Sequence, residues 1–552
     1  MNMLMLIAAV TVFDFGPDGA GGYPEIEVTG VTAPAKVRVV YATHPDGLTD
    51  KGDFWHETRA TYMGPDLWLP ILPASTDRYD VFSVTSNGVY RSPLVQGLVR
   101  YAKWSLDAGK ADVRQIRLVN RAVHSVETVL GSFACSDARL DAVWKASVRT
   151  CQLAAIPGRT TPLEVCGPRS SATLGPSYPY LSDGAKRDRL VWSGDLWWAQ
   201  RNMYVAFAFD SPYMPGSIRM LGENQLPNGY VQACPYPESH AVAKADDYGP
   251  FASDEFACWF VPVVCDHYLC TGDEKTTREA YPRVVKLMDY LGAHQRAGGK
   301  LFEPRRETCK GAAGLVFGSR SLHHSAYMNI LLWKTYRDAA ALADVFGSKT
   351  EADEWRSAAE ILAGEIRRAF WDEKNGYFRQ SLEEDAFAKE GNPLALAAHF
   401  VTEAEAERIV PALRRHSHGK FQAMAARGAF EYGYADRAMA LIAEHNWYKV
   451  VEPEWKGLRL TSECMGLIRK GWGDEAHPDT AIAGLFTNYI LGVEPVEPGY
   501  AAFRVRPLVP AGITWANGVV PTPKGFIKVA WTMKNGFPDV TVRAPVGCRQ
   551  VE

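Results

Sequence analysis

The stretch CSDARLDAVWKASVRTCQLAA, residues 135–155, changes the chain from strand periodicity to helix periodicity. Ser136 and Asp137 are candidate N-caps, because a short polar side chain can accept a hydrogen bond from the first backbone N–H groups of a helix. Apolar residues then recur three or four positions apart on one helical face, at Leu140, Val143, Trp144 and Val148. This spacing predicts an amphipathic helix at the start of a helical domain.

The residues before this stretch alternate between apolar and polar in period two, as strands do. The alternation is clear in EIEVTGV (25–31), KVRVVYA (36–42), YDVFSV (79–84) and QIRLV (115–119). We therefore predict an N-terminal β-sandwich domain over residues 1–128. MNMLMLIAAVTV (1–12) has no basic residue before its apolar run. That favours a first strand over an export signal, and a cytoplasmic protein over a periplasmic or secreted one.

The residues after it carry a series of helical patterns joined by Trp- and Pro-rich loops. The predicted helices cover 195–210, 213–224, 252–270, 274–295, 322–346, 351–371, 393–400, 403–415, 421–444 and 479–491. Several are apolar nearly all round, as expected for inner helices wrapped by outer ones. No fixed sequence repeat of about 30 to 45 residues is visible, so an (α/α)6 barrel over residues 129–494 fits better than a superhelical repeat array.

The tail of the chain returns to strand patterns. They are AAFRVRPLV (501–509), FIKVAWTM (526–533) and DVTVRAPV (539–546), with VPTPKG (520–525) as a turn. We predict a C-terminal β-sandwich domain over residues 495–552. The predicted fold is therefore a multidomain α and β protein, with a helical barrel flanked by two β-sandwich domains.

Composition excludes several classes of partner. The 552 residues hold 60 Lys and Arg against 63 Asp and Glu, so no positive surplus points to nucleic acid or an anionic membrane. No run of 18 apolar residues predicts a spanning helix. The ten cysteines form no CxxC pair, and the adjacent His323 and His324 diverge on a helix and lack a third ligand, so we predict no metal. No nucleotide or phosphate motif appears, so we predict no cofactor.

The stretch SDGAKRDRLVWSGDLWW, residues 182–198, concentrates charge and aromatic rings. Its acids are Asp183, Asp188 and Asp195, its bases Lys186, Arg187 and Arg189, and its tryptophans Trp192, Trp197 and Trp198. A polar pocket with aromatic walls explains both features, because a dry core would not tolerate unpaired charges. A salt-bridged loop that pins a helix, with Asp195 as its N-cap, explains them as well.

The segment from Asp183 to Asp195 resembles the signature loop of the α-L-rhamnosidases of glycoside hydrolase family 78. Three flanking segments resemble that family in the same order: FDFGPDGAGGYPEIEV (13–28), GSFACSDARLDAVWKAS (131–147) and LGVEPVEPGYAAFRVRPLVP (491–510). The resemblance implies a β-sandwich, an (α/α)6 barrel and a second β-sandwich. It also implies removal of terminal α-L-rhamnose from glycosides or oligosaccharides, with inversion at the anomeric carbon and no cofactor.

The resemblance also assigns roles to residues. The usual Glu acid of the loop is absent and the loop is one residue shorter, so Asp188 is the implied general acid. Glu463 is the implied base, although the spacer to the following His477 is shorter than usual, and Glu475 is the main alternative. The implied sugar-pocket residues are Asp183, Arg187, Trp192, Asp195, Trp198, Asp254, Trp259 and His477.

Two other functions stay open at this point. The altered loop could serve a different glycone, such as a uronide, in which case an Arg or Lys should face the sugar carboxylate. The chain could also be a non-catalytic carbohydrate-binding descendant, in which case no Glu or Asp should lie across the pocket from Asp188. The sequence does not determine the oligomeric state or the aglycone.

Overall fold

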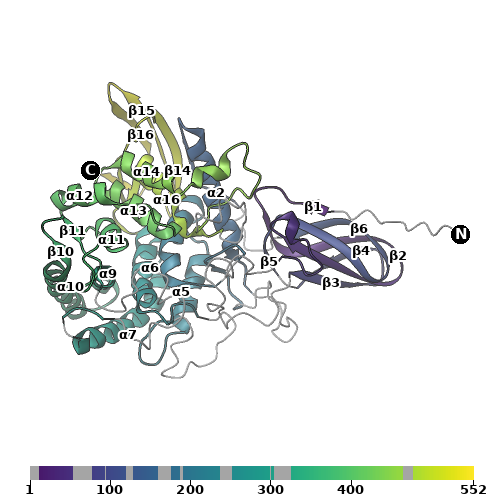
Figure 1. Cartoon of the computed structure of the whole chain (residues 1–552), viewed down its shortest axis with the longest axis horizontal. Coiled ribbons are helices and arrows are strands. Elements are labelled where there is room, and N and C mark those ends of the chain that lie inside the picture. Colours follow the sequence, from purple (N-terminus) through teal and green to yellow (C-terminus); the bar gives the residue numbers. More distant parts are fainter. Residues whose placement is uncertain are drawn as a thin grey trace.

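A computed structural model gives the structure of the chain. It describes residues 12–53, 78–93, 95–119, 128–158, 176–186, 190–235, 252–298, 300–303, 325–463 and 476–552. An N-terminal sheet, a central body of helices and a C-terminal sheet succeed one another along the chain (Figure 1). Among these residues, no helix combines the length and hydropathy needed to cross a bilayer.

The N-terminal sheet has six strands in its described part: β1 (Val12–Asp14), β2 (Ala20–Ala42), β3 (Tyr79–Val84), β4 (Gly88–Arg91), β5 (Gln96–Val99) and β6 (Tyr101–Val119). The long strands β2 and β6 pair antiparallel along most of their length, and β3, β4 and β5 pair with β2. The alternation predicted for this region is confirmed, since Ile26, Val28, Val37 and Val39 are buried in the core of the sheet domain.

The helical body contains long helices and short ones. They are α2 (Ala138–Ala154), α4 (Ser193–Ala206), α5 (Tyr213–Glu223), α6 (Asp254–Thr271), α7 (Glu274–Gly298), α9 (Ala326–Phe346), α10 (Lys349–Phe370), α11 (Gly391–Ala397), α12 (Glu403–Ile409), α13 (Gly419–Glu431), α14 (Ala435–Glu444) and α16 (Ile482–Leu485). Asp137 caps α2 by accepting a hydrogen bond from the Arg139 N–H at 2.9 Å, as the sequence predicts. Ser136 instead accepts from the Thr514 N–H at 2.9 Å.

Six of these helices contact one another in a closed circuit. α4 packs on α6, α6 on α9, α9 on α11 and α11 on α13. α13 contacts the short helix Pro478–Thr480, which leads into α16, and α16 packs back on α4. α4 and α9 are buried on nearly all sides. α10, which packs on α9, buries only one stripe of side chains, as an outer helix should.

Two predicted helices are interrupted. The pattern over 421–444 predicts one helix, but the structure has α13 and α14, separated at Gly433 with φ of 80°. A residue at positive φ cannot continue a right-handed helix, and glycine adopts this conformation without a steric penalty. The pattern over 479–491 becomes the short helix Pro478–Thr480, α16 and a π-helical turn over Phe486–Ile490.

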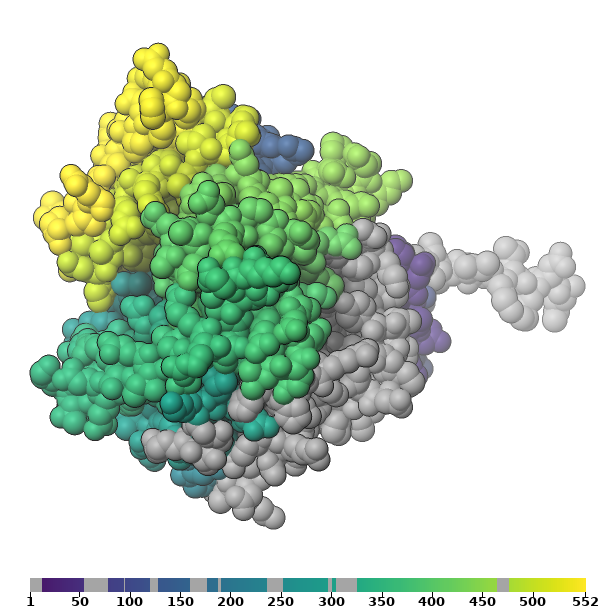
Figure 2. Space-filling model, turned by 60° about the vertical axis from the view of Figure 1, so that its left-hand side comes forward, coloured from purple at the N-terminus to yellow at the C-terminus, as the bar shows by residue number. Residues whose placement is uncertain are grey.

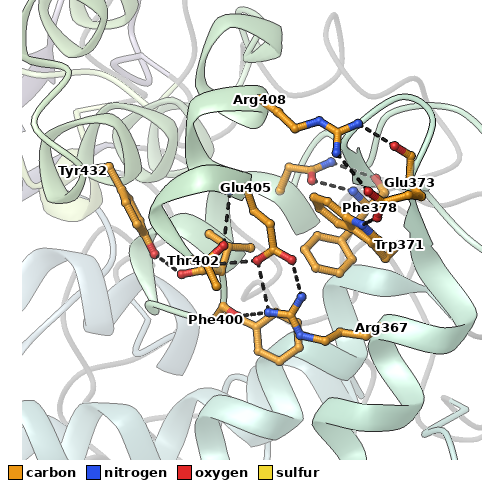
Figure 3. Close-up of polar contacts among 11 residues, drawn as sticks. Arg367, Trp371, Glu373, Phe378, Phe400, Thr402, Glu405, Arg408 and Tyr432 are labelled. Atoms are coloured by element: carbon orange, nitrogen blue, oxygen red, sulfur yellow. Dashed lines mark hydrogen bonds and ion pairs between the residues drawn. The ribbon is translucent and has the colours of Figure 1, made fainter.

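A polar network around α12 joins this helix to α10 at the surface of the helical body (Figure 3). Thr402 and Glu405 form a capping box at the start of this helix. Arg367 of α10 makes an ion pair with Glu405 and donates a hydrogen bond to the Phe400 carbonyl at 2.9 Å. One arginine therefore fixes both the cap of α12 and the chain that leads into it.

The C-terminal sheet contains a strand that the sequence places elsewhere. Its order is β16 (Phe537–Arg543), β15 (Gly525–Lys534), β14 (Trp515–Thr522) and β7 (Ser132–Cys135). β7 precedes α2 and was expected within the helical domain. A second sheet joins β12 (Val493–Pro495), β13 (Ala502–Val505) and β17 (Arg549–Val551). Figure 2 shows this yellow C-terminal part packed on the green helical segment.

Candidate active site

The two described ends of the signature loop are joined to each other. Arg187, Asp188 and Arg189 lie outside the described residues. On either side of them, the Asp183 N–H donates to the Leu190 carbonyl at 2.8 Å, and the Leu190 N–H donates to the Asp183 carboxylate at 3.1 Å. Asp183 therefore closes the base of the loop, and its contact with a sugar stays a prediction.

The loop leads into α4, whose first turn holds Asp195. The helix begins at Ser193, after Trp192, and no side-chain hydrogen bond caps it. The alternative in which Asp195 is the N-cap is therefore wrong, because Asp195 is already the third residue of the helix. Its carboxylate instead accepts a hydrogen bond from the Lys420 ammonium at 3.0 Å.

The tryptophans of this region pack on one another. The Trp197 ring stacks on Trp259 of α6 with centroids 4.4 Å apart and meets Trp198 edge to face at 4.5 Å. All three side chains are buried. The Trp192 ring meets Phe256 edge to face at 5.3 Å, also in a buried cluster. These rings pack together at the first turns of α4 and α6 and form an apolar cluster there. Sugar contact by Trp192, Trp198 and Trp259 stays a prediction.

Asp195 belongs to a buried group that we call the acid cluster: Asp195, Glu255, Lys420 and Asp479. Lys420, at the start of α13, is the cation of this group among the described residues, and its ammonium lies 4.5 Å above the Phe256 ring. Burial lowers the pKa of Lys420, but Asp195, Glu255 and Asp479 outweigh it and raise that pKa above the ordinary value. The ammonium therefore stays charged.

Two carboxyl groups of the acid cluster, those of Glu255 and Asp479, have raised pKa values, the opposite of what an ordinary ion pair produces. Burial raises the pKa of Glu255 to about 7, against the opposing effects of Lys420 and of the Tyr327 hydroxyl, which donates to Glu255 at 2.7 Å. Burial, with Asp195 and Glu463 nearby, raises the pKa of Asp479 well above its usual range. Burial and the neighbouring acids therefore favour the protonated forms of Glu255 and Asp479.

Glu463, the predicted base, lies between two histidines. Its Oε1 is 2.6 Å from His418 Nε2, and its Oε2 is 3.8 Å from His477 Nδ1. Burial lowers the pKa of His418 in spite of this carboxylate. The backbone is held as well, since the Glu463 carbonyl accepts from the Gly419 N–H and Ser462 pairs with Ala476 in an isolated bridge. The structure thus brings the predicted pair Glu463 and His477 together.

Two family models match the sequence around this site and beyond it. The bacterial alpha-L-rhamnosidase 6 hairpin glycosidase domain matches residues 176–423, and the bacterial alpha-L-rhamnosidase C-terminal domain matches residues 492–551. Together the two matches span more than half of the chain. The chain belongs to the bacterial α-L-rhamnosidase family, glycoside hydrolase family 78. The first match includes the signature loop and Lys420, whereas Glu463 lies outside both.

Relatives of this rhamnosidase-family chain share its fold at low identity. A curated α-L-rhamnosidase from Alteromonas sp. (strain LOR) is 24% identical over 397 residues, which is 66% of this chain and 40% of that protein. The GH78 rhamnosidase structure from Bacillus sp. GL1 has a TM-score of 0.71 at 18% identity, over 98% of this chain and 52% of that one. A Klebsiella oxytoca rhamnosidase solved with rhamnose bound has a TM-score of 0.63 at 17% identity, over 86% of each chain. The chain thus spans about half or less of the length of the first two.

Four residues of this rhamnosidase-family site were missed by sequence reasoning: His418, Lys420, Glu255 and Asp479, the last of which lies two residues after His477. His418 and Lys420 flank Gly419 at the start of a helix pattern that was read only for its apolar face. The sequence did contain one signal for these residues, because Lys420 is a charged residue at the start of an otherwise apolar helix. Glu255 directly follows Asp254, which was predicted instead, and both are buried in the first turn of α6. Glu475 and the pair His323 and His324 lie outside the described residues.

The site also contains a set of atoms that could hold a metal ion. One ligand atom each from His418, Glu463 and Asp479 lies within 4.8 Å of the others. The donor set of one imidazole and two carboxylates suits Zn²⁺ or a similar divalent cation. The same positions are explained by proton sharing, because His418 contacts Glu463 directly and Asp479 has a raised pKa. The effect of a chelator on activity distinguishes metal binding from proton sharing.

Proposed function

We propose that the chain is an inverting α-L-rhamnosidase that removes terminal α-L-rhamnose from glycosides or oligosaccharides, with Asp188 as general acid and Glu463 as general base. The observation that carries the proposal is the partly buried Glu463 carboxylate held between His418 and His477. A base needs such a fixed orientation to take a proton from one defined water. Family membership and the signature loop support the choice of sugar.

The proposal includes an (α/α)6 barrel as the catalytic domain, with β-sandwich domains on both sides. The circuit through α4, α6, α9, α11, α13 and α16 supports six inner helices. α4, α6 and α13 each place residues of the site in their first turn: Asp195, Glu255 and Lys420. A ring of inner helices with their N-termini on one side would gather these side chains into one pocket.

The reaction needs two proton transfers on opposite faces of the sugar. Asp188 protonates the glycosidic oxygen as the bond to the anomeric carbon breaks, and Glu463 accepts a proton from the water that attacks the same carbon from the other face. In an inverting enzyme the two carboxyl groups lie about 6.5–9.5 Å apart, which leaves room for that water. A neutral His418 donating from Nε2 would hold Glu463 Oε1 and leave Oε2 for the water.

The acid cluster suits recognition of the sugar hydroxyls. A protonated carboxyl both donates and accepts hydrogen bonds, and so does a sugar hydroxyl. Burial raises the pKa of Glu255 to about 7 and that of Asp479 well above its usual range, which favours their protonated forms, while Lys420 is a donor only. Among the described residues of the site, Lys420, the cation that a sugar carboxylate could contact, is already engaged by Asp195, so the alternative of a uronide substrate gains little.

The first test is hydrolysis of 4-nitrophenyl α-L-rhamnopyranoside by the wild type, Asp188→Asn and Glu463→Gln. We expect turnover by the wild type and a loss of at least about 100-fold in each variant. Glu475→Gln is the matched control and should keep near wild-type activity. Proton NMR of the first turnovers should show β-L-rhamnose before mutarotation, as inversion requires.

The outcomes separate the alternatives. Activity that survives Glu463→Gln but not Glu475→Gln would move the base to Glu475. An α-anomer as first product would contradict inversion. A wild type that binds rhamnose but turns over no aryl glycoside would favour the carbohydrate-binding descendant.

A further inference from the structure

The last described residue before Arg187 in the signature loop, Lys186, is held by the N-terminal domain. Its side chain is 1% exposed, and its ammonium donates to the Asp53 carboxylate at 2.8 Å. Asp53 also accepts from the Arg78 guanidinium at 2.8 Å and from the Thr43 N–H at 2.8 Å. We call Asp53, Arg78 and Lys186 the anchor cluster.

The two cations of the anchor cluster favour the ionised form of the Asp53 carboxyl group. Burial pushes the pKa of Asp53 up, but Lys186 and Arg78 outweigh burial and bring it below its ordinary value. Gly52 has φ of 77°, and a Cβ there would come within 2.3 Å of the Arg78 carbonyl. The backbone therefore leaves no room for a side chain at Gly52, the residue directly before Asp53.

Backbone contacts beside Lys186 tie the same loop to two other segments. The Leu98 N–H of β5 donates to the Ala185 carbonyl at 2.9 Å, and the Ala185 N–H donates to the Ala476 carbonyl at 2.9 Å. Ala476 directly precedes His477. Leu98, Ala185 and Ala476 also share one buried apolar cluster. One residue of the loop, Ala185, therefore connects the N-terminal sheet with the segment that carries His477.

We propose that Asp53, acting through Lys186, is a positioning residue for the general acid Asp188, so that the N-terminal domain is part of the catalytic apparatus. Asp188 is two residues after Lys186 and two before Leu190, which is bonded to Asp183 at the other end of the loop. The anchored residues therefore fix where the chain enters and leaves the segment with the acid. This inference rests on the proposed function.

The test uses Lys186→Gln, which removes the link but leaves the Asp53–Arg78 ion pair balanced. The substrates are 2,4-dinitrophenyl, 4-nitrophenyl and phenyl α-L-rhamnopyranoside. A poor leaving group needs protonation and a good one does not, so misplacing the acid should slow phenyl rhamnoside most. We expect kcat to fall about tenfold or more for phenyl and less than about threefold for 2,4-dinitrophenyl, with KM little changed.

Further variants keep the outcome decisive. Lys186→Arg retains the ion pair and should restore most of the phenyl rate, whereas Asp53→Asn should show the same leaving-group dependence as Lys186→Gln. Asp107→Asn, which breaks the exposed Arg38–Asp107 pair in the same domain, is the control and should change no rate. An equal loss on all three substrates, or no loss on any, would overturn the proposal.

Asp188→Asn provides the reference. It should show the steepest leaving-group dependence of all variants. If Asp188→Asn shows no such dependence, Asp188 is not the acid and the proposed function fails on its own account. If it does and Lys186→Gln does not, only the positioning role fails.

Discussion

The anchor cluster and the acid cluster are both buried groups of charges, yet their carboxyl groups behave in opposite ways. In the anchor cluster two cations face one carboxylate, and the pKa of Asp53 is lowered. In the acid cluster, the described residues place one cation among three acids, and the pKa values of Glu255 and Asp479 are raised. Burial is equally complete in both, so the balance of charge decides the protonation state.

The anchor cluster and the acid cluster use buried charge in two different ways. The Asp53 carboxylate, whose ionised form is favoured by two cations, holds the N-terminal sheet and the signature loop in one geometry. Carboxyl groups with raised pKa values, such as Glu255 at about 7, can both donate and accept hydrogen bonds and can respond to pH. Lys186 of the anchor cluster and Asp195 of the acid cluster lie at opposite ends of the segment 186–195. In the proposed function, the anchor cluster therefore holds the loop and the acid cluster binds the substrate.

The largest effect is expected from breaking the anchor cluster. Asp53→Asn leaves Lys186 and Arg78 buried without their counter-ion, which should lower the free energy of unfolding by about 3–5 kcal/mol. Urea denaturation followed by tryptophan fluorescence measures this. The exposed control Asp107→Asn should cost at most about 1 kcal/mol. Equal effects of the two substitutions would show that burial of the anchor cluster adds nothing.

Removing the one cation of the acid cluster should have the next largest effect. Lys420→Met leaves Asp195, Glu255 and Asp479 to repel one another, so kcat/KM for 4-nitrophenyl α-L-rhamnopyranoside should fall about 100-fold. Lys334→Met is the matched control, because Lys334 pairs with Asp338 at 2.7 Å within α9 and belongs to neither cluster. A loss of less than about threefold for Lys420→Met would contradict a role in the site.

Glu255 should give stability a pH dependence that the anchor cluster lacks. Its pKa is about 7 in the native state against an ordinary 4.5, so between these values the native state keeps a proton that the unfolded chain releases. The free energy of unfolding should therefore fall as pH rises from about 4.5 to 7, by at most about 3 kcal/mol. Glu255→Gln should remove this slope, which thermal unfolding across that pH range would detect. A slope unchanged in the variant would locate the titration elsewhere.

The smallest effect is expected from chelation. Proton sharing explains the closeness of His418, Glu463 and Asp479, so dialysis against EDTA should leave kcat unchanged. Activity that is lost on chelation and restored by a divalent cation would instead make these three residues metal ligands.

Sequence patterns that act over a few neighbouring residues predicted several helices of this protein. The bounds of α6, α9 and α10 fall within about four residues of the sequence prediction, because apolar period and capping act over a few neighbouring residues. Glu463 and His477 were named together from the family resemblance, and the structure brings them together. The break at Gly433 was missed because an isolated glycine inside a helical pattern is often tolerated.

The order of strand and helix regions, the family and the segment that carries the chemistry could be recognised from the sequence, because each depends on residues close together along the chain. Which charges meet, in contrast, follows from the three-dimensional packing. Lys420 reaches Asp195 across 225 residues, Lys186 reaches Asp53 across 133, and β7 joins the C-terminal sheet far from its neighbours in sequence. Such contacts depend on how whole elements pack, and the pKa values follow from the packing: a carboxyl group is protonated or ionised according to the partners that the fold buries beside it.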